Sequence, residues 1–153
     1  MPVKKRLDEA FEEIIDSIVE TLQGATEEGE LLEEIKSVVR GDRSRPRPDL
    51  PALWIFPERA TAQSTPRTIA ETWDLPISLT VVVKSDDPEI GQKVSTRLSA
   101  LSRSVILKDR SLGLRDFVQD TRSGSFEPSG PHHNEGTLWG SASQIIVKFV
   151  ICE

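Results

Sequence analysis

The fold is decided by Trp73-Asp-Leu-Pro-Ile-Ser-Leu-Thr-Val-Val-Val-Lys-Ser-Asp-Asp-Pro-Glu89. Apolar residues alternate with mostly polar ones as far as Val83, which is the period of a half-buried β-strand. Pro76 has no N–H to donate, so we expect it at a sheet edge or at a bulge. The strand then enters an Asp-Asp-Pro-Glu turn, a typical helix start in which Asp87 is the N-cap. This stretch therefore predicts a strand followed directly by a helix.

The rest of the sequence from residue 52 onward predicts one helix and three further strands. The helix, over about residues 88–104, buries a stripe made by Ile90, Val94, Leu98 and Leu101. Strong alternation predicts a strand over Leu138–Cys152, and weaker signals predict strands near 117–126 and 53–56. The polar stretch 58–71 predicts a loop or a hairpin edge, and 127–137 predicts a long exposed hairpin loop.

The N-terminal third predicts helices. Apolar residues from Leu7 to Leu22 follow one helical stripe, and a second stripe predicts another helix over Glu28–Val39 that Gly41 closes. Residues 42–51 contain three prolines, which lack a backbone N–H and favour an extended conformation of the residues before them, so this stretch predicts an extended Arg/Pro loop. Acids are concentrated at this end of the chain, because residues 1–35 hold eleven acids against three bases.

We therefore predict an α+β protein of a single domain, 1–153. It comprises an N-terminal helical segment (1–41), the Arg/Pro loop (42–51) and a sheet with its helix (52–153). The expected architecture is a mostly antiparallel sheet of about four strands, packed against an N-terminal helix or helix pair and one central helix.

The composition excludes several classes of protein. No apolar run approaches the roughly 20 residues of a membrane span, and the charged N-terminus is not a secretory signal. Cys152 cannot form an intrachain disulfide, and we expect it to be buried as a small hydrophobic residue. A net charge of -6 and the absence of Tyr argue against a general nucleic-acid binder.

Few residues could carry chemistry. His132 and His133 are adjacent in a Gly/Pro loop, where two neighbours rarely face one metal ion. Asp86, Asp87 and Glu89 could in principle act as acid and base, but helix capping already explains them. We therefore predict no catalytic, cofactor or metal site, and a protein that is not an enzyme.

The sharpest local charge feature of the sequence is a set of four guanidinium groups within eight residues: Arg40, Arg43, Arg45 and Arg47. In a ring, several copies of this loop could line the lumen and face DNA that passes through it. The alternative is a solvated loop that pairs with the acidic N-terminal helices.

The order of elements resembles that of phage tail terminator, or tail completion, proteins. The resemblance covers roughly residues 7–22 and 50–153, and residues 73–89 are its most specific part. The closing strand of the family corresponds to Leu138–Ile151, and its first strand to Leu53–Pro57. The predicted second helix and the Arg/Pro loop depart from the compact form of the family.

This resemblance implies a structural protein of the bacteriophage virion, located at the head-proximal end of the tail and assembled in the host cytoplasm. Such proteins form a homo-oligomeric ring, usually a hexamer, that caps the tail tube and provides the docking surface for the head or neck. The implied partners are itself, the tail-tube protein, the head or neck connector protein, and genomic DNA that passes without sequence-specific binding. Neither a membrane nor a cofactor is implied.

Three alternatives remain open. The protein could be a head completion or neck (head-tail connector) protein, a cellular α+β protein-interaction domain, or a small hydrolase or metal-dependent enzyme. For a ring subunit, we expect the loops to contact other subunits or partners, and the candidate contact residues are Glu58, Arg59, Arg67, His132 and His133.

Overall fold

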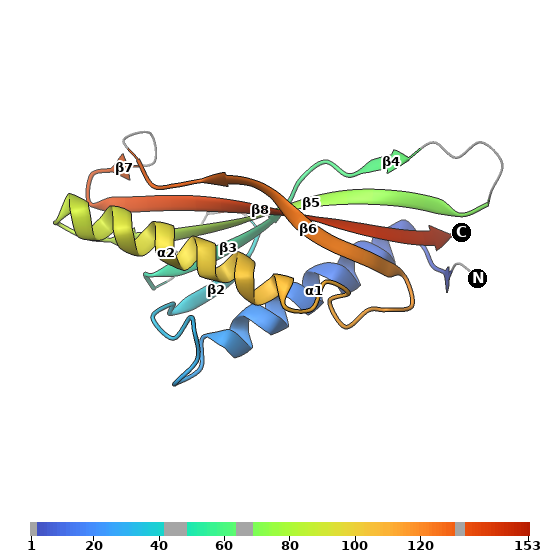
Figure 1. The fold of residues 1–153 in the computed structure, drawn as a ribbon, viewed down its shortest axis with the longest axis horizontal. Helices are drawn as coiled ribbons and strands as arrows, with labels where there is room; N and C mark the ends of the chain where they lie inside the picture. Colours follow the sequence, from blue (N-terminus) through green and yellow to red (C-terminus); the bar gives the residue numbers. More distant parts are fainter. Residues whose placement is uncertain (1–2, 42–48, 64–68, 131–133) are drawn as a thin grey trace.

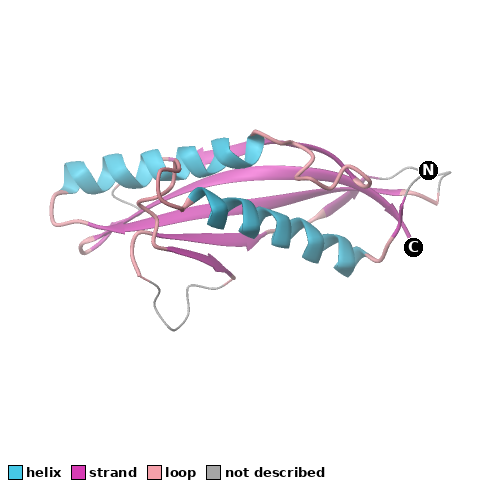
Figure 2. Ribbon diagram, turned by 90° about the horizontal axis from the view of Figure 1, so that it is seen from below, coloured by secondary structure: helices cyan, strands magenta, loops and turns pink. Residues whose placement is uncertain are grey.

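Two helices lie on one face of a single sheet (Figure 2) in the computed structural model, which describes residues 3–41, 49–63, 69–130 and 134–153. The elements in chain order are β1 (Val3–Lys4), α1 (Leu7–Ala25), β2 (Ser37–Arg40), β3 (Ala52–Pro57), β4 (Thr61–Gln63), β5 (Glu71–Lys84), α2 (Pro88–Leu107), β6 (Val118–Glu127), β7 (Asn134–Glu135) and β8 (Leu138–Cys152). The predicted α+β class is confirmed.

The sheet is organised around β5 and β8, which run antiparallel along the length of the molecule (Figure 1). Their register extends from Glu71 opposite Ile151 to Lys84 opposite Leu138. Strands β3 and β4 pair with the other edge of β5, whereas β6, β7 and β1 pair with the other edge of β8. The pairings β1–β8 and β2–β3 are parallel, and the others in the described residues are antiparallel.

The predicted sheet is therefore correct only in outline. Strands β3, β5, β6 and β8 are the four expected ones, but the described residues form a mixed sheet of eight strands. Four of these strands are short, and β2 and β1 bring in parallel pairs that the sequence did not suggest. The stretch 58–71 proves to contain a hairpin edge, since β4 pairs with β5.

The predicted helix over Glu28–Val39 is wrong. Gly29 has a φ of +85°, which a helix does not accommodate, and residues 26–34 form successive turns instead. Val38 and Val39 then lie in β2, where β-branched side chains are favoured, and Gly41 follows a strand rather than a helix. The N-terminal segment 1–41 thus supplies one helix and two strands, and no helix pair forms.

The predicted strand parity is confirmed on the face that the helices cover. Leu75, Ile77, Leu79, Val81 and Val83 of β5 are buried there. The matching residues of β8 are Ile145, Val147, Phe149 and Ile151, and α1 contributes Ala10, Ile14, Ile15, Ile18 and Leu22. One continuous core therefore joins α1, α2 and the sheet.

Pro76 lies at the break between two neighbouring strands, as its missing N–H requires. The β3 register ends with Pro57 opposite Ile77, and the β4 register resumes with Thr61 opposite Asp74. Between them the Glu58 N–H donates to the Pro76 carbonyl over 2.8 Å. A residue without a donor is tolerated here because the regular ladder is interrupted.

Helix α2 begins as the sequence predicts but buries a different face. Asp87 Oδ1 accepts from the N–H of Glu89 at 2.9 Å, which confirms the N-cap. Ile90 is not part of the buried stripe, since its side chain is 54% exposed. The face that meets the sheet consists largely of small residues: Gly91, Ser95, Leu98, Ser99 and Ser102.

These small residues let α2 approach β8 closely. A Cβ on Gly91 would lie 2.3 Å from Trp139 Cδ1, a distance that real Cβ atoms do not show. The hydroxyls of Ser95 and Ser102 donate back to the carbonyls of Gly91 and Leu98, both at 2.7 Å, so burying them costs no hydrogen bond. Trp139 is held in turn by its indole N–H, which donates to the Ser85 carbonyl at 3.1 Å.

Replacing Gly91 with Ala should therefore lower the free energy of unfolding by about 1–3 kcal/mol, since Trp139 must move out of a packed position. Gly24→Ala in α1 is the matched control, because a Cβ there meets nothing within 4 Å. It should raise stability by up to about 1 kcal/mol through its better helix propensity. Chemical denaturation of both variants measures the difference, and an equal response would contradict the close approach of α2 to Trp139.

Candidate functional site

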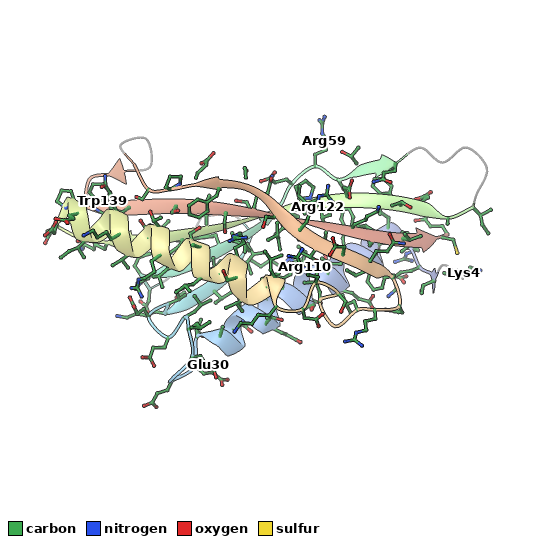
Figure 3. All side chains as sticks on the ribbon, viewed as in Figure 1. Lys4, Glu30, Arg59, Arg110, Arg122 and Trp139 are labelled. Carbon is green, nitrogen blue, oxygen red and sulfur yellow. The ribbon has the colours of Figure 1, made fainter. Side chains whose placement is uncertain are left out.

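Of the predicted contact residues, the structure describes Glu58 and Arg59. Both follow β3 and both are exposed. Glu58 Oε2 accepts a hydrogen bond from Gln144 Nε2 at 2.8 Å, whereas Arg59 projects away from the sheet (Figure 3). The other candidates, Arg43, Arg45, Arg47, Arg67, His132 and His133, lie outside the described residues.

The second face of the sheet carries no helix in the described part of the chain (Figure 2). We call it the open face, and its centre consists of the even-numbered residues of β5 and β8. These side chains are mostly half-buried, and they include Thr72, Asp74, Pro76 and Ser78 of β5 and Ala142, Gln144, Ile146, Lys148 and Val150 of β8. The open face is therefore a broad surface of polar and small apolar groups.

Two polar bridges cross the open face. In the first, Gln144 Oε1 accepts from the N–H of Ser125 at 3.1 Å while its amide nitrogen donates to Glu58. Gly124 makes this possible, because a Cβ there would lie 2.2 Å from Gln144 Oε1. One side chain thereby connects β6, β8 and the segment after β3.

The second bridge is centred on Asp74 of β5. Its carboxylate accepts from Gln63 Nε2 at 3.2 Å and from Arg122 Nη1 at 3.4 Å. Lys148 lies opposite Asp74 in the register, and Asp120 lies opposite Lys148. Charges of both signs alternate across this part of the open face, so it offers no basic surface that would attract phosphates.

One end of the open face is apolar. Ala52, Trp54 and Val82 form a second buried cluster, against which Val39, Leu50, Phe56 and Leu138 pack. These side chains have the opposite parity to the main core. The sequence pattern could not reveal this cluster, because Val81, Val82 and Val83 interrupt the alternation of β5 and leave the role of Val82 open.

A groove lies at the opposite side of the molecule, where the C-terminal ends of both helices meet. It has a volume of about 470 Å³ and is formed by Thr21, Gly24 and Ala25 of α1, by Glu30 and Leu31 of the following turn, and by residues of the segment 105–113. Its apolar lining comes from Leu31, Val105, Ile106 and Leu112. We call it the helix-end groove.

The lining of the helix-end groove contains charged residues of both signs: Glu30, Lys108 and Asp109. Residues 20–34 contain Glu20, Glu27, Glu28, Glu30, Glu33 and Glu34 and no basic residue. Figure 3 shows Glu30 on the turn that follows α1. Leu31, which the sequence placed on a buried helical stripe, is 50% exposed within this acidic region. The acidic run was visible in the sequence, but the groove was not, because its walls come from segments about 80 residues apart.

Asp109 also lines the helix-end groove. Its carboxylate accepts from the Ser111 hydroxyl at 2.6 Å, from the Ser111 N–H at 3.1 Å and from the Gly113 N–H at 3.0 Å. The turn that it closes places Leu112 at a φ of +56° and Gly113 at +69°. The hydrogen bond from the Ser111 hydroxyl is the main reason why the pKa of Asp109 is lowered below its ordinary value.

The described residues contain no group of three His, Cys, Asp or Glu side chains able to hold a metal ion. No described helix has both the length and the apolar character that crossing a membrane demands. Asp87 is engaged as the N-cap of α2, and Cys152 is half-buried at the end of β8.

No protein-family model matches the chain. No curated protein matches it either.

The Asp109 turn should make stability depend on acid pH. A carboxyl whose pKa is lower in the folded state stabilises the fold above its unfolded pKa of about 3.9, and this contribution is lost as pH falls through the folded pKa. Asp109→Asn should therefore lower the melting temperature at pH 7, and the difference from the unchanged protein should shrink below about pH 4. Asp116→Asn, which alters an exposed carboxyl outside this turn, is the control. A pH-independent difference for Asp109→Asn would contradict the role of its charge.

Proposed function

We propose that this protein is a structural ring subunit of a bacteriophage virion, a tail terminator that caps the tail tube and receives the head or neck. The observation that supports this best is the one-sided architecture. Both helices cover one face of the sheet, and the open face extends along β5 and β8 without a covering helix in the described residues. A subunit with two unlike faces and a rigid sheet between them suits a role that consists of binding alone.

The two long edges of the sheet also differ from each other. On one side lie β2 and β4, which are short, and on the other lies β6, which contains two register shifts. Unlike edges favour heterologous contacts, in which one patch of a subunit meets a different patch of its neighbour. Such contacts close into a ring when the rotation between neighbours allows it, and the ring then has two different ends. One end can meet the tail tube while the other meets the head or neck.

The balanced charges of the open face suit the wall of a channel through which DNA passes without being bound tightly. The Asp74, Lys148, Asp120 and Arg122 side chains of the open face balance one another. A lumen wall of this kind would give little counterion release, so DNA could move past it without strong adhesion. Which surface lines the lumen, and whether Arg43, Arg45 and Arg47 reach it, stays a prediction from the sequence.

A capping assay tests the proposed function. Purified protein added to polymerising tail-tube protein should stop tube growth, and electron microscopy should show extra density at one end of each tube. The Val81→Asp variant is the control, because a charge on the buried face of β5 should destabilise the fold by several kcal/mol and so remove the effect. Tubes that grow to the same length with and without the folded protein would contradict the terminator role, and binding only to a purified head connector would favour the neck protein.

A further inference from the structure

The outer strand on one side of the sheet is β6, which in the described part of the chain pairs with β8 and with no other strand. The Val150 N–H of β8 donates to the Phe117 carbonyl at 2.9 Å, so the backbone groups of Val150 are directed toward β6. Hydrogen-bonded and non-bonded positions alternate along an antiparallel pair. Lys148 and Ile146 are therefore directed toward β6 as well, and the positions between them are not.

Thr121 and Ser123 consequently present their backbone groups to the outside of the sheet. They lie opposite Val147 and Ile145, the positions of β8 that alternate with the bonded ones. Outward N–H and C=O groups on the last strand of a sheet form a template on which a strand of another chain can pair. Without protection, β6 would therefore be a place where subunits associate through their backbones.

Two arginines, one in α2 and one just after its end, cover this edge. Arg110, labelled in Figure 3, donates from Nη1 to the outward Thr121 carbonyl at 3.1 Å. Arg103 Nη1 donates to the Ser123 hydroxyl at 2.7 Å. Neither arginine forms a salt bridge with another described residue, so the hydrogen bonds that hold both guanidinium groups are made with β6.

The part of β6 that these arginines cover is complementary to itself. Register shifts flank it on both sides and leave residues 120–123 as its regular stretch. A second copy that paired with this stretch antiparallel about Thr121 would place Asp120 of each copy opposite Arg122 of the other. Opposite charges at facing positions stabilise a pair of strands. Such a contact is isologous and joins two subunits only, so it competes with the heterologous contacts that close a ring.

We infer that Arg110 and Arg103 seal the edge of β6 against strand pairing with a second copy of this chain. Arg110 occupies the Thr121 carbonyl, which is the central acceptor of that pairing, and Arg103 lies across the next outward position, Ser123. The seal is an inhibitory contact within the subunit, and it leaves side chains to make the contacts of this edge with a neighbour. The inference deepens the proposed ring function and rests on that function for its biological setting.

Removal of the guanidinium groups tests the seal. Arg110→Ala, alone and together with Arg103→Ala, should form species larger than those of the unchanged protein at concentrations at least about tenfold lower, measured by sedimentation velocity. Arg97→Ala is the matched control, because Arg97 also belongs to α2 but bonds to Glu34 at 2.7 Å and not to β6. It should associate as the unchanged protein does. Equal association of Arg97→Ala and Arg110→Ala would indicate a general effect of lost charge and overturn the inference.

Amide hydrogen exchange shows whether the new association uses β6. In the associated Arg110→Ala protein, the amides of Thr121 and Ser123 should exchange at least about tenfold more slowly than in the dilute protein, followed by nuclear magnetic resonance. Adding Asp120→Lys should reverse the association, because like charges then face each other across the paired strands. Association that leaves these two amides unprotected would lie on another surface and overturn the inference.

Circular dichroism of the dilute variants shows whether each one folds. If Arg110→Ala does not fold, Arg103→Ala alone decides: it should still increase association, by a smaller factor, and no increase in any folded variant overturns the inference. If tail-tube capping fails while Arg110→Ala associates through β6, the proposed function is wrong and the seal stands. If the unchanged protein caps tubes while folded Arg110→Ala associates no more than it does, the function stands and the seal is wrong.

Discussion

The antiparallel pairing of β5 with β8 is the interaction on which the rest of the structure depends. Side chains of a strand alternate between faces, so this register decides at once which residues meet the helices and which lie on the open face. A slip of one residue would move Leu75, Ile77 and Leu79 to the open face and bring Asp74 and Lys148 into the core. The apolar parity of both strands opposes such a slip, so the helices pack on the face that carries Leu75, Ile77 and Leu79.

The helix layer follows from this pairing through residue size. Ser141 and Ser143 of β8 are buried opposite the small residues of α2, and the Ser143 hydroxyl donates to the Ser99 carbonyl at 3.1 Å. Small side chains on both partners bring helix and sheet close together, while large apolar residues fill the space around α1. The helix-end groove lies in this layer, between the C-terminal parts of α1 and α2.

Strand alternation and capping could be read from the sequence, and the elements that escaped prediction did so for physical reasons. Trp73 to Glu89 specified β5 and the start of α2, because period-two alternation and the N-cap are local signals. The helix expected over Glu28–Val39 was predicted from spacing alone, because Leu31, Leu32, Ile35, Val38 and Val39 fit a helical stripe. The same spacing does not exclude turns followed by a short strand, which is what forms. Pairing of β2 with β3 decided between the two outcomes, and that pairing is not local. Ile90 was misplaced because the helical stripe does not show that Gly91, one position away, has to face Trp139.

The candidate surfaces show the same division between local and non-local information. Glu58 could be proposed as a contact residue, but its bond to Gln144 depends on a residue 86 positions away. The acidic run of residues 20–34 was evident in the sequence. Only the fold shows that part of it, at Glu30 and Leu31, lies beside apolar residues of α2 and the Asp109 turn. Leu31 is half exposed in the helix-end groove, beside the charged residues Glu30, Lys108 and Asp109. On the open face, Asp74 pairs with Gln63 and Arg122, three residues from three different strands. Both surfaces are built from segments far apart in the sequence, so their residue types could be read from the sequence while their arrangement required the fold.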